Sequence, residues 1–238
     1  LHGFMEDLSM WDEFIEDLSV THKVVCIDLL GHGKSECIGD VHSMETMATV
    51  VSFVIEHLNI DRIKLVGHSM GGYVALALAE LKPSLIKDCV LLNSTFLADD
   101  KARKVLRLKA IEQAKESESA YKKLIRLSFT NLFAQESLEK FKNAFHRSLD
   151  KALQTPLCGY IGALEGMMLR PERFQVFNEI DGRKVIIAGK KDNLIKTAEL
   201  RKRIEGSSIE LLEFSGGHMT HIENKSELSY FLKHFIEL

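Results

Sequence analysis

Short apolar segments alternate with longer amphipathic segments along most of the chain. Apolar runs rich in β-branched residues predict buried strands over residues 23–28, 62–66, 89–93, 184–188 and 209–214. Apolar positions at helical spacing predict helices over residues 9–18, 43–58 and 70–81, the second capped by Ser43 and ending at Asn59. Strands that alternate with helices in this way require a parallel sheet with helices on both faces. The predicted fold class is therefore α/β, with a mostly parallel, doubly wound sheet.

The alternation stops between residues 97 and 180. Only helical periodicity is found there, including one apolar stripe made of Ala102, Val105, Leu106, Leu108, Ile111 and Ala114. Strands resume at Lys184. We therefore predict two parts, a core of residues 1–96 and 181–238 and an inserted helical cap of residues 97–180.

Composition limits the class of protein. A chain of 238 residues with 45% apolar content can bury the core of one domain plus an insertion. The net charge of −3 gives no indication of nucleic-acid binding, and no apolar run is long enough to span a membrane. The four cysteines, Cys26, Cys37, Cys89 and Cys158, show neither metal-like pairing nor the density of a disulfide scaffold. They indicate a reducing compartment, and we expect a cytoplasmic protein.

The segment Gly67-His68-Ser69-Met70-Gly71-Gly72 joins a predicted strand to a predicted helix. A serine at such a tight turn takes a strained backbone conformation that exposes its Oγ, and Gly67 and Gly71 leave room for the turn. The Met70 N–H then lies in the first turn of the helix, where it lacks an acceptor and can bind a developing oxyanion. Ser69 is therefore the predicted nucleophile.

A serine nucleophile needs a histidine base and a carboxylate that orients the histidine. Asp192 follows the strand at 184–188, and His218 follows the strand at 209–214 after two glycines. Both loops lie at the carboxyl ends of strands, where open parallel sheets bind ligands. We predict His218 as the base, with His221 as the alternative. For the acid, Asp181 precedes its strand and Asn93 offers no carboxylate, which leaves Asp192.

The segment His2-Gly3-Phe4 follows what the sequence indicates is the end of a strand. A His-Gly turn in that position directs the next backbone N–H toward the site. We predict that Phe4 N–H and Met70 N–H together form the oxyanion hole.

These residues give the chain a resemblance to the α/β-hydrolase fold family, within its esterase and lactonase branch with a helical cap, which includes bacterial carboxylesterases. The resemblance rests on His2-Gly3-Phe4, the turn at residues 28–35, the turn around Ser69, the Asp192 loop and Gly217-His218-Met219 with Glu223. Members normally carry further strands before the His-Gly turn. We therefore expect the sequence to be a fragment whose N-terminal strands are missing.

The expected activity is hydrolysis of carboxylic esters with small to medium acyl groups through an acyl-enzyme. A carbon–carbon bond hydrolase, a lactonase or a perhydrolase would use the same triad, and a receptor of the same fold would bind its ligand without turnover. The sequence shows no metal-binding cluster and no phosphate-binding loop, so we expect no cofactor and no metal. The expected partner is a small-molecule ester.

Two segments of the cap carry open questions. Residues 101–126 contain nine basic and three acidic residues, a local net charge of +6, which suits either a solvated helix face or docking of an acidic acyl carrier. Residues 157–169 are apolar, with small residues and two methionines. This segment fits either an acyl pocket or packing of the cap against the core.

Overall fold

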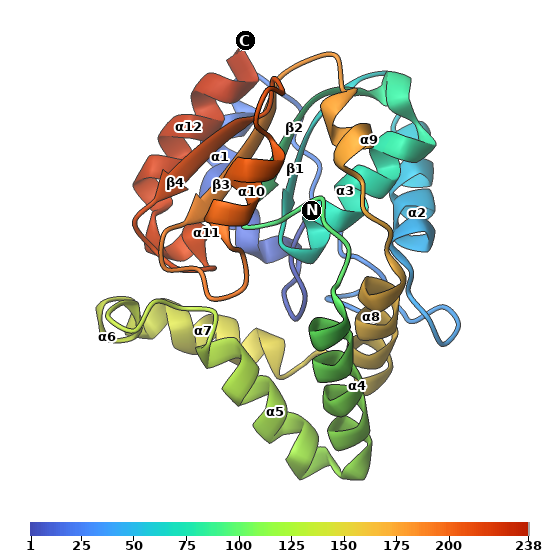
Figure 1. The fold of residues 1–238 in the computed structure, drawn as a ribbon, viewed down its shortest axis with the longest axis vertical. Coiled ribbons are helices and arrows are strands. Elements are labelled where there is room, and N and C mark those ends of the chain that lie inside the picture. The colour runs from blue at the N-terminus through green and yellow to red at the C-terminus, as the bar shows by residue number, and fades with distance from the viewer. Residues whose placement is uncertain (238) are drawn as a thin grey trace.

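The computed structural model describes residues 1–237 and is built around a parallel sheet (Figure 1). Its strands follow the order β1-β2-β3-β4, with bounds Ile63–His68, Ile86–Leu92, Lys184–Gly189 and Glu210–Phe214. Every neighbouring pair is parallel, with Val66 opposite Val90 and Ile187 opposite both Leu92 and Leu212. The carboxyl ends of all these strands therefore lie at one edge, and the predicted fold class is confirmed.

Helices cover both faces of the sheet (Figure 1). In β2, Cys89 and Leu91 pack into the core beneath α2 and α3, whereas Val90 and Leu92 pack on the opposite face against α1 and α12. This alternation is the two-residue period of a strand that is buried on both sides. The core helices are α1 (Asp12–Ser19), α2 (Met44–His57), α3 (Met70–Leu81), α10 (Thr197–Arg203), α11 (Thr220–Glu223) and α12 (Lys225–Glu237).

Local signals placed several helix ends correctly. The Ser43 hydroxyl accepts a hydrogen bond from Thr46 N and caps α2, and Asn59 has a φ of 53° just after that helix. Helix α3 has the predicted bounds. The helix predicted over residues 9–18 is a short 3-10 turn, Leu8–Trp11, followed by α1.

The strand predicted over residues 23–28 is wrong. No strand is formed there, and a groove of about 450 Å³ lies between this segment and β1. Val24 and Ile27 line one part of the groove and Ile63 and Leu65 another. The segment has the composition of a strand, but no backbone lies beside it to complete a hydrogen-bonded ladder.

Between β2 and β3 the described chain forms only helices. All but the last of them lie beyond the carboxyl edge of the sheet, and the last packs on α3 (Figure 1). Their bounds are α4 Lys101–Glu116, α5 Glu118–Thr130, α6 Ser137–Lys140, α7 Lys142–Ala152, α8 Leu157–Leu169 and α9 Phe174–Asn178. We call α4 to α8 the cap helices. The division into a core and a cap with the boundaries given above stays a prediction.

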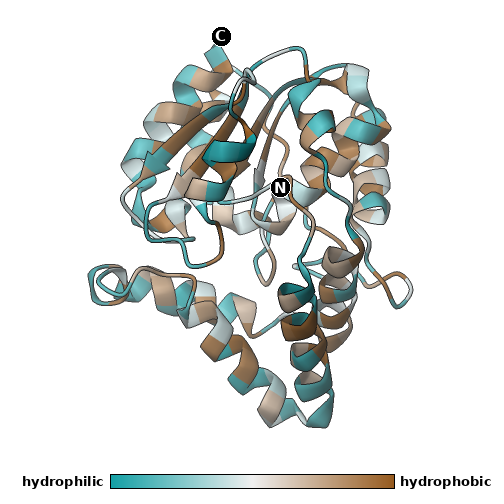
Figure 2. Ribbon diagram, viewed as in Figure 1, coloured by the Kyte–Doolittle hydropathy of each residue, from teal (hydrophilic) through white to brown (hydrophobic). Residues whose placement is uncertain are grey.

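The apolar stripe predicted on α4 is wrong over its first half. Ile111 and Ala114 are buried, but Val105, Leu106 and Leu108 are about half or more exposed, at 49%, 66% and 50%. Figure 2 shows that α4 projects away from the sheet and carries many hydrophilic positions. Periodicity identified the helix, but it could not show which of its apolar positions have an apolar neighbour to pack against.

Helix α8 packs closely on the loop that precedes α2. A side chain at Gly159 would overlap the backbone of Gly31, and one at Gly166 would overlap the backbone of His42. His42 N also donates to the Gly162 carbonyl at 3.0 Å. These contacts support the packing role of the small residues in this segment, which the sequence left open.

The same contact is bridged by a disulfide between Cys37 and Cys158. Cys26 and Cys89 are free. The two paired residues are 121 positions apart, so no local spacing could identify them. Cysteine composition therefore no longer supports a reducing compartment. In residues 1–237, no helix combines the length and the apolar run needed to cross a lipid bilayer.

Candidate active site

Ser69 lies at the sharp turn between β1 and α3 in a strained conformation. Its φ of 48° and ψ of −116° are sparsely populated for a residue with a side chain. A Cβ on Gly67 would overlap the Gly71 carbonyl, and a Cβ on Gly71 would overlap the carbonyls of Leu1 and His2. The two glycines therefore permit the close approach that holds Ser69 in this turn, as predicted.

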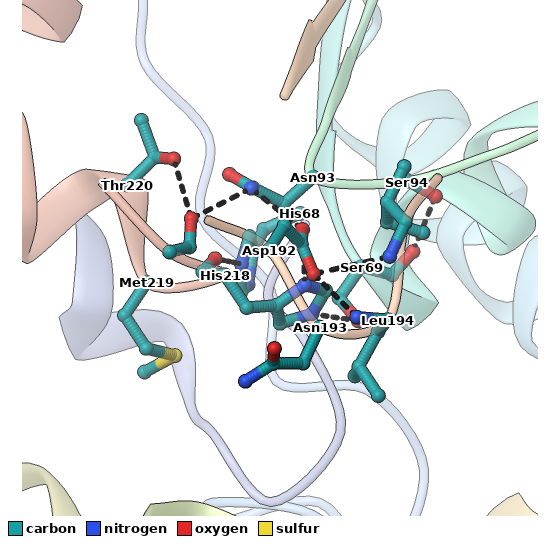
Figure 3. Close-up of polar contacts among 12 residues, drawn as sticks. His68, Ser69, Asn93, Ser94, Asp192, Asn193, Leu194, His218, Met219 and Thr220 are labelled. Carbon is teal, nitrogen blue, oxygen red and sulfur yellow. Dashed lines mark hydrogen bonds and ion pairs between the residues drawn. The ribbon is translucent and has the colours of Figure 1, made fainter. Parts of the chain in front are cut away.

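Ser69, His218 and Asp192 form one hydrogen-bonded chain (Figure 3). His218 Nε2 lies 2.8 Å from Ser69 Oγ, and His218 Nδ1 lies 2.8 Å from Asp192 Oδ2. The side chain of Asp192 is fully buried and that of His218 is 2% exposed. This is the arrangement in which a histidine removes the serine proton while a carboxylate fixes its tautomer.

Asp192 is held as a carboxylate by several donors. Asn93 Nδ2 donates to its Oδ2 at 2.9 Å, and the backbone N–H groups of Leu194 and Ile195 donate to its Oδ1. Burial opposes ionisation, but the charge and hydrogen bond of His218 together with the other donors outweigh it and lower the pKa of Asp192. The Asp192 carboxyl group is therefore ionised beside His218.

Asn93 has a supporting part that the sequence analysis missed. It was set aside because it carries no carboxylate, yet its side-chain amide bridges Asp192 and the Gly217 carbonyl. Asn93 also has a positive φ of 45°. The signal in the sequence was its position directly after a strand at the catalytic edge.

The cap contacts the loops that carry the acid and the base. His218 N donates to the Leu132 carbonyl at 2.8 Å, and Asn193 Nδ2 donates to the Asn131 carbonyl at 3.2 Å. Glu223 Oε2 accepts from Ala134 N at 3.1 Å. Movement of the segment after α5 would therefore disturb the base directly.

Phe4 and Met70 lie where the sequence placed the oxyanion donors. Met70 is the first residue of α3, and Phe4 directly follows the His-Gly turn. Among the described residues, neither backbone N–H has a protein acceptor. Tyr160 of α8 packs on the Phe4 ring at 5.0 Å between centroids. Their role as an oxyanion hole stays a prediction.

His2 holds the turn before Phe4 in place. It makes no hydrogen bond to Ser69, His218 or Asp192 among the described residues. Its Nε2 accepts from Leu29 N at 2.9 Å, so its Nδ1 donates to the Gly3 carbonyl. Burial is the main reason why the pKa of His2 falls to about 3, with the neighbouring His32 adding to the effect. A neutral, fully buried His2 therefore anchors the Phe4 turn to the loop at Leu29.

Glu6 and His68 form a buried pair beside the base, and the sequence analysis missed it. Glu6 Oε2 accepts from Gly3 N at 2.8 Å and lies 2.6 Å from His68 Nδ1, while His68 Nε2 donates to the His218 carbonyl at 3.0 Å. Burial alone would lower the pKa of His68, but the charge and hydrogen bond of Glu6 raise it. One carboxylate therefore links the Phe4 turn, the residue before Ser69 and the loop of His218.

His221, predicted as the alternative base, contacts Glu6 and His68. Its Nε2 lies 3.4 Å from Glu6 Oε1, and its ring packs against His68 at 5.2 Å. Burial lowers the pKa of His221 to about 4, despite the opposing charge of Glu6. His218 is thus the histidine that lies within hydrogen-bond distance of Ser69.

Part of the basic segment of the cap is engaged within the protein. Arg107 pairs with Asp99 at 2.6 Å, and Asp99 also binds Arg170 at 2.9 Å, whose guanidinium stacks on Tyr73. Arg103 donates to the Leu194 carbonyl. These contacts tie α4 to the core. The expectation of an acidic acyl carrier as a partner stays a prediction for the remaining lysines.

Comparisons with known proteins agree with this fold. Two solved structures with the same fold are a thermophilic esterase from Thermogutta terrifontis and the enol-lactonase from Burkholderia xenovorans LB400. The esterase superimposes with a TM-score of 0.90 and 23% identity over 99% of this chain and 87% of its own. The lactonase gives 0.89 and 23% over 100% and 89%.

Two sequence relatives match almost the whole of this chain but different shares of their own length. The dihydrolipoyllysine-residue acetyltransferase component of the acetoin cleaving system of Pseudomonas putida is 27% identical, and the match covers 98% of this chain but 63% of that protein. A putative 2-succinyl-6-hydroxy-2,4-cyclohexadiene-1-carboxylate synthase of Bacillus subtilis is 24% identical over 94% of this chain and 84% of its own length. Residues 1–225 match the family described as alpha/beta hydrolase fold. The chain therefore belongs to the alpha/beta hydrolase fold family.

Proposed function

We propose that this protein is a serine hydrolase that cleaves carboxylic esters of small to medium acyl groups. The observation that carries the proposal is the unbroken chain from Ser69 Oγ through His218 to Asp192, with 2.8 Å at each step. A serine at this turn makes an ester intermediate with the acyl group. The esterase and enol-lactonase folds among the structural neighbours are consistent with this chemistry.

The proposed reaction has two halves. Ser69 Oγ attacks the ester carbonyl while His218 Nε2 takes its proton, and the resulting oxyanion accepts hydrogen bonds from Phe4 N–H and Met70 N–H. The tetrahedral intermediate collapses, His218 returns the proton to the leaving alkoxide, and the alcohol departs. Water then loses a proton to His218 and attacks the acyl-enzyme. Collapse of the second intermediate releases the carboxylic acid while His218 returns the proton to Ser69 Oγ, which restores both residues.

Buried Asp192 favours this cycle in two ways. It accepts from His218 Nδ1, so Nε2 faces Ser69 with a free lone pair, and its negative charge stabilises the imidazolium formed during attack. In the same site Glu6 and His68 hold the backbone of the base, and they are proposed as positioning residues rather than catalytic ones.

The test is capture by a fluorophosphonate probe together with steady turnover of p-nitrophenyl esters. Ser69→Ala should lose both activities, with a rate loss of about 10⁵-fold or more, while circular dichroism shows an intact fold. The exposed Ser119→Ala is the matched control and should behave as the unchanged protein. Retained turnover in Ser69→Ala would reject the nucleophile. Probe capture without turnover in the unchanged protein would favour a ligand-binding receptor.

A further inference from the structure

Three side chains from distant segments meet beside the base without belonging to the catalytic chain. Glu6 follows the His-Gly turn, His68 ends β1, and His221 lies in α11. One donor atom from each of them lies within 4.8 Å of the other two. No local spacing in the sequence indicates a metal-binding cluster, because these residues are separated by 62 positions (68 − 6) and 153 positions (221 − 68).

The donor types suit a transition metal. One carboxylate and two imidazoles are a ligand set used by zinc, whereas Ca²⁺ and Mg²⁺ prefer oxygen donors throughout. Bonds of about 2.0–2.1 Å in a tetrahedral site place neighbouring ligand atoms roughly 3.3 Å apart. His221 Nε2 and Glu6 Oε1 are already 3.4 Å apart. His68 Nδ1 lies 2.6 Å from Glu6 Oε2, and an ion bound there would replace the proton that these two atoms share.

His221 lacks hydrogen-bond partners. Its Nδ1 is buried with no partner among the described residues, and the contact of its Nε2 with Glu6 is its one polar contact. The side chain is 5% exposed. Nδ1 lies on the other side of the ring from Glu6, so the atom that would bind an ion is Nε2, whose lone pair faces Glu6 when Nδ1 carries the proton.

His68 is oriented as metal-binding histidines usually are. Its Nε2–H donates to the His218 carbonyl at 3.0 Å, so the ring directs Nδ1 at Glu6. A ligating imidazole typically donates its other N–H to a carbonyl or carboxylate, which fixes the ring and the tautomer. The His218 carbonyl fills that place here.

The cluster is also reachable from outside. A cleft of about 590 Å³ between the core and the cap is lined by Glu6 and His221, together with Phe141 and Arg147 of the cap. An ion can enter through this cleft, and water from the cleft can complete its coordination. Ser69 does not line the cleft, so the path to the ion is separate from the nucleophile.

We propose that Glu6, His68 and His221 form a binding site for a divalent transition-metal cation of the Zn²⁺ or Co²⁺ class, with its fourth position open to the cleft. The site does not depend on the proposed ester hydrolysis. His68 also donates a hydrogen bond to the His218 carbonyl. An ion bound to His68 would therefore be linked to the backbone of His218 through this hydrogen bond.

The probe is Co²⁺, whose tetrahedral complexes absorb strongly in the visible range while the hydrated ion does not. Tag-free protein titrated with Co²⁺ should develop this band to saturation at one ion per chain, and Zn²⁺ should displace it. Ser69→Ala should bind equally well, which separates this test from the proposed function. Bound Zn²⁺ should also raise the melting temperature of the unchanged protein by mass action.

His221→Ala should lose the band and the thermal shift, with at least tenfold weaker binding. His57→Ala, at an exposed histidine, is the matched control and should keep both. His221→Cys, which supplies a thiolate at the same place, should restore a band with a sulfur-to-metal charge-transfer component. Absence of saturable binding in the unchanged protein, or equal binding in His221→Ala, would overturn the proposal and leave the cluster as a buried ion pair.

Discussion

At the carboxyl edge of the sheet, Ser69, Asp192 and His218 are each held by hydrogen bonds from several segments, and their side chains are almost fully buried where they meet. In the first half of α4, by contrast, leucines face solvent and most lysines have no fixed partner among the described residues. Both regions were predicted from the same sequence. They differ in how far local pattern determines the environment of a side chain.

At the edge, the topology of the sheet does most of the positioning. Parallel strands bring the loops after β1, β3 and β4 to one place, so a residue that follows its strand reaches the site whatever its distance in sequence. In α4, the spacing of apolar residues predicts only that the segment is a helix. Whether a given face is covered depends on where neighbouring helices lie, and the pattern carries no information on that.

The largest expected effect separates the two histidines at the edge. His218→Ala should reduce kcat/KM for a p-nitrophenyl ester by about 10⁴-fold or more, because the proton of Ser69 loses its acceptor. His221→Ala should cost tenfold or less, since its ring contacts Glu6 and not Ser69. Steady-state kinetics of both variants is the measurement. If the two losses were reversed, the assignment of the base would be wrong.

Asp192→Asn should have the next largest effect, a fall in kcat of roughly 10³- to 10⁴-fold. The amide removes the charge that stabilises the imidazolium and no longer selects the tautomer with Nε2 facing Ser69. Its neighbour Asn193, whose side chain binds only the Asn131 carbonyl, provides the control, and Asn193→Ala should stay within a few-fold of the unchanged rate. Near-normal rates in Asp192→Asn would show that another group supports His218.

A matched pair within α4 tests the comparison by stability. Ile111 is 5% exposed and Leu106 is 66% exposed on the same helix. Ile111→Ala should lower the free energy of unfolding by about 2–4 kcal/mol, whereas Leu106→Ala should change it by less than about 0.5 kcal/mol. Urea denaturation of both variants gives the two values. Equal losses would mean that the exposed half of α4 is covered in solution.

The smallest expected effect concerns the pH dependence of stability. Burial is the main cause that lowers the pKa of His32 to about 4 from an ordinary value of 6.5. Between these two pH values the unfolded chain binds more protons at His32 than the folded chain does. The contribution of His32 to the free energy of unfolding is therefore fully present above about pH 6.5 and decreases as the pH drops toward 4. His32 should contribute up to about 1.4 kcal/mol per pH unit to this slope.

His32→Asn should reduce that slope, measured as the free energy of unfolding at several pH values between 4 and 7. The exposed His57→Asn should leave the slope unchanged. His2, whose pKa is lowered further, would still contribute in the same direction. An identical slope in His32→Asn and the unchanged protein would show that His32 is not held neutral.

Features set by local sequence patterns could be predicted, whereas features set by contacts between distant segments could not. The meeting of Ser69, Asp192 and His218 was predictable because each follows a strand that ends at the same edge of the sheet. Glu6 and His68 were not, because their meaning comes from contacts between distant segments. The segment at residues 23–28 failed for a related reason, since a strand needs a neighbour as well as a composition.

The Cys37–Cys158 disulfide closes residues 37–158 into a covalent ring. The ring contains β1, Ser69, β2 and α4 to α7, while Asp192 and His218 lie on the tail outside it. A single tryptic cut within the ring, for example in α5 after the exposed Lys122 or Lys123, cannot separate the two pieces. A nicked molecule would therefore run as one band on a non-reducing gel and as two after reduction, with the nucleophile still linked to the acid and base until the disulfide is broken.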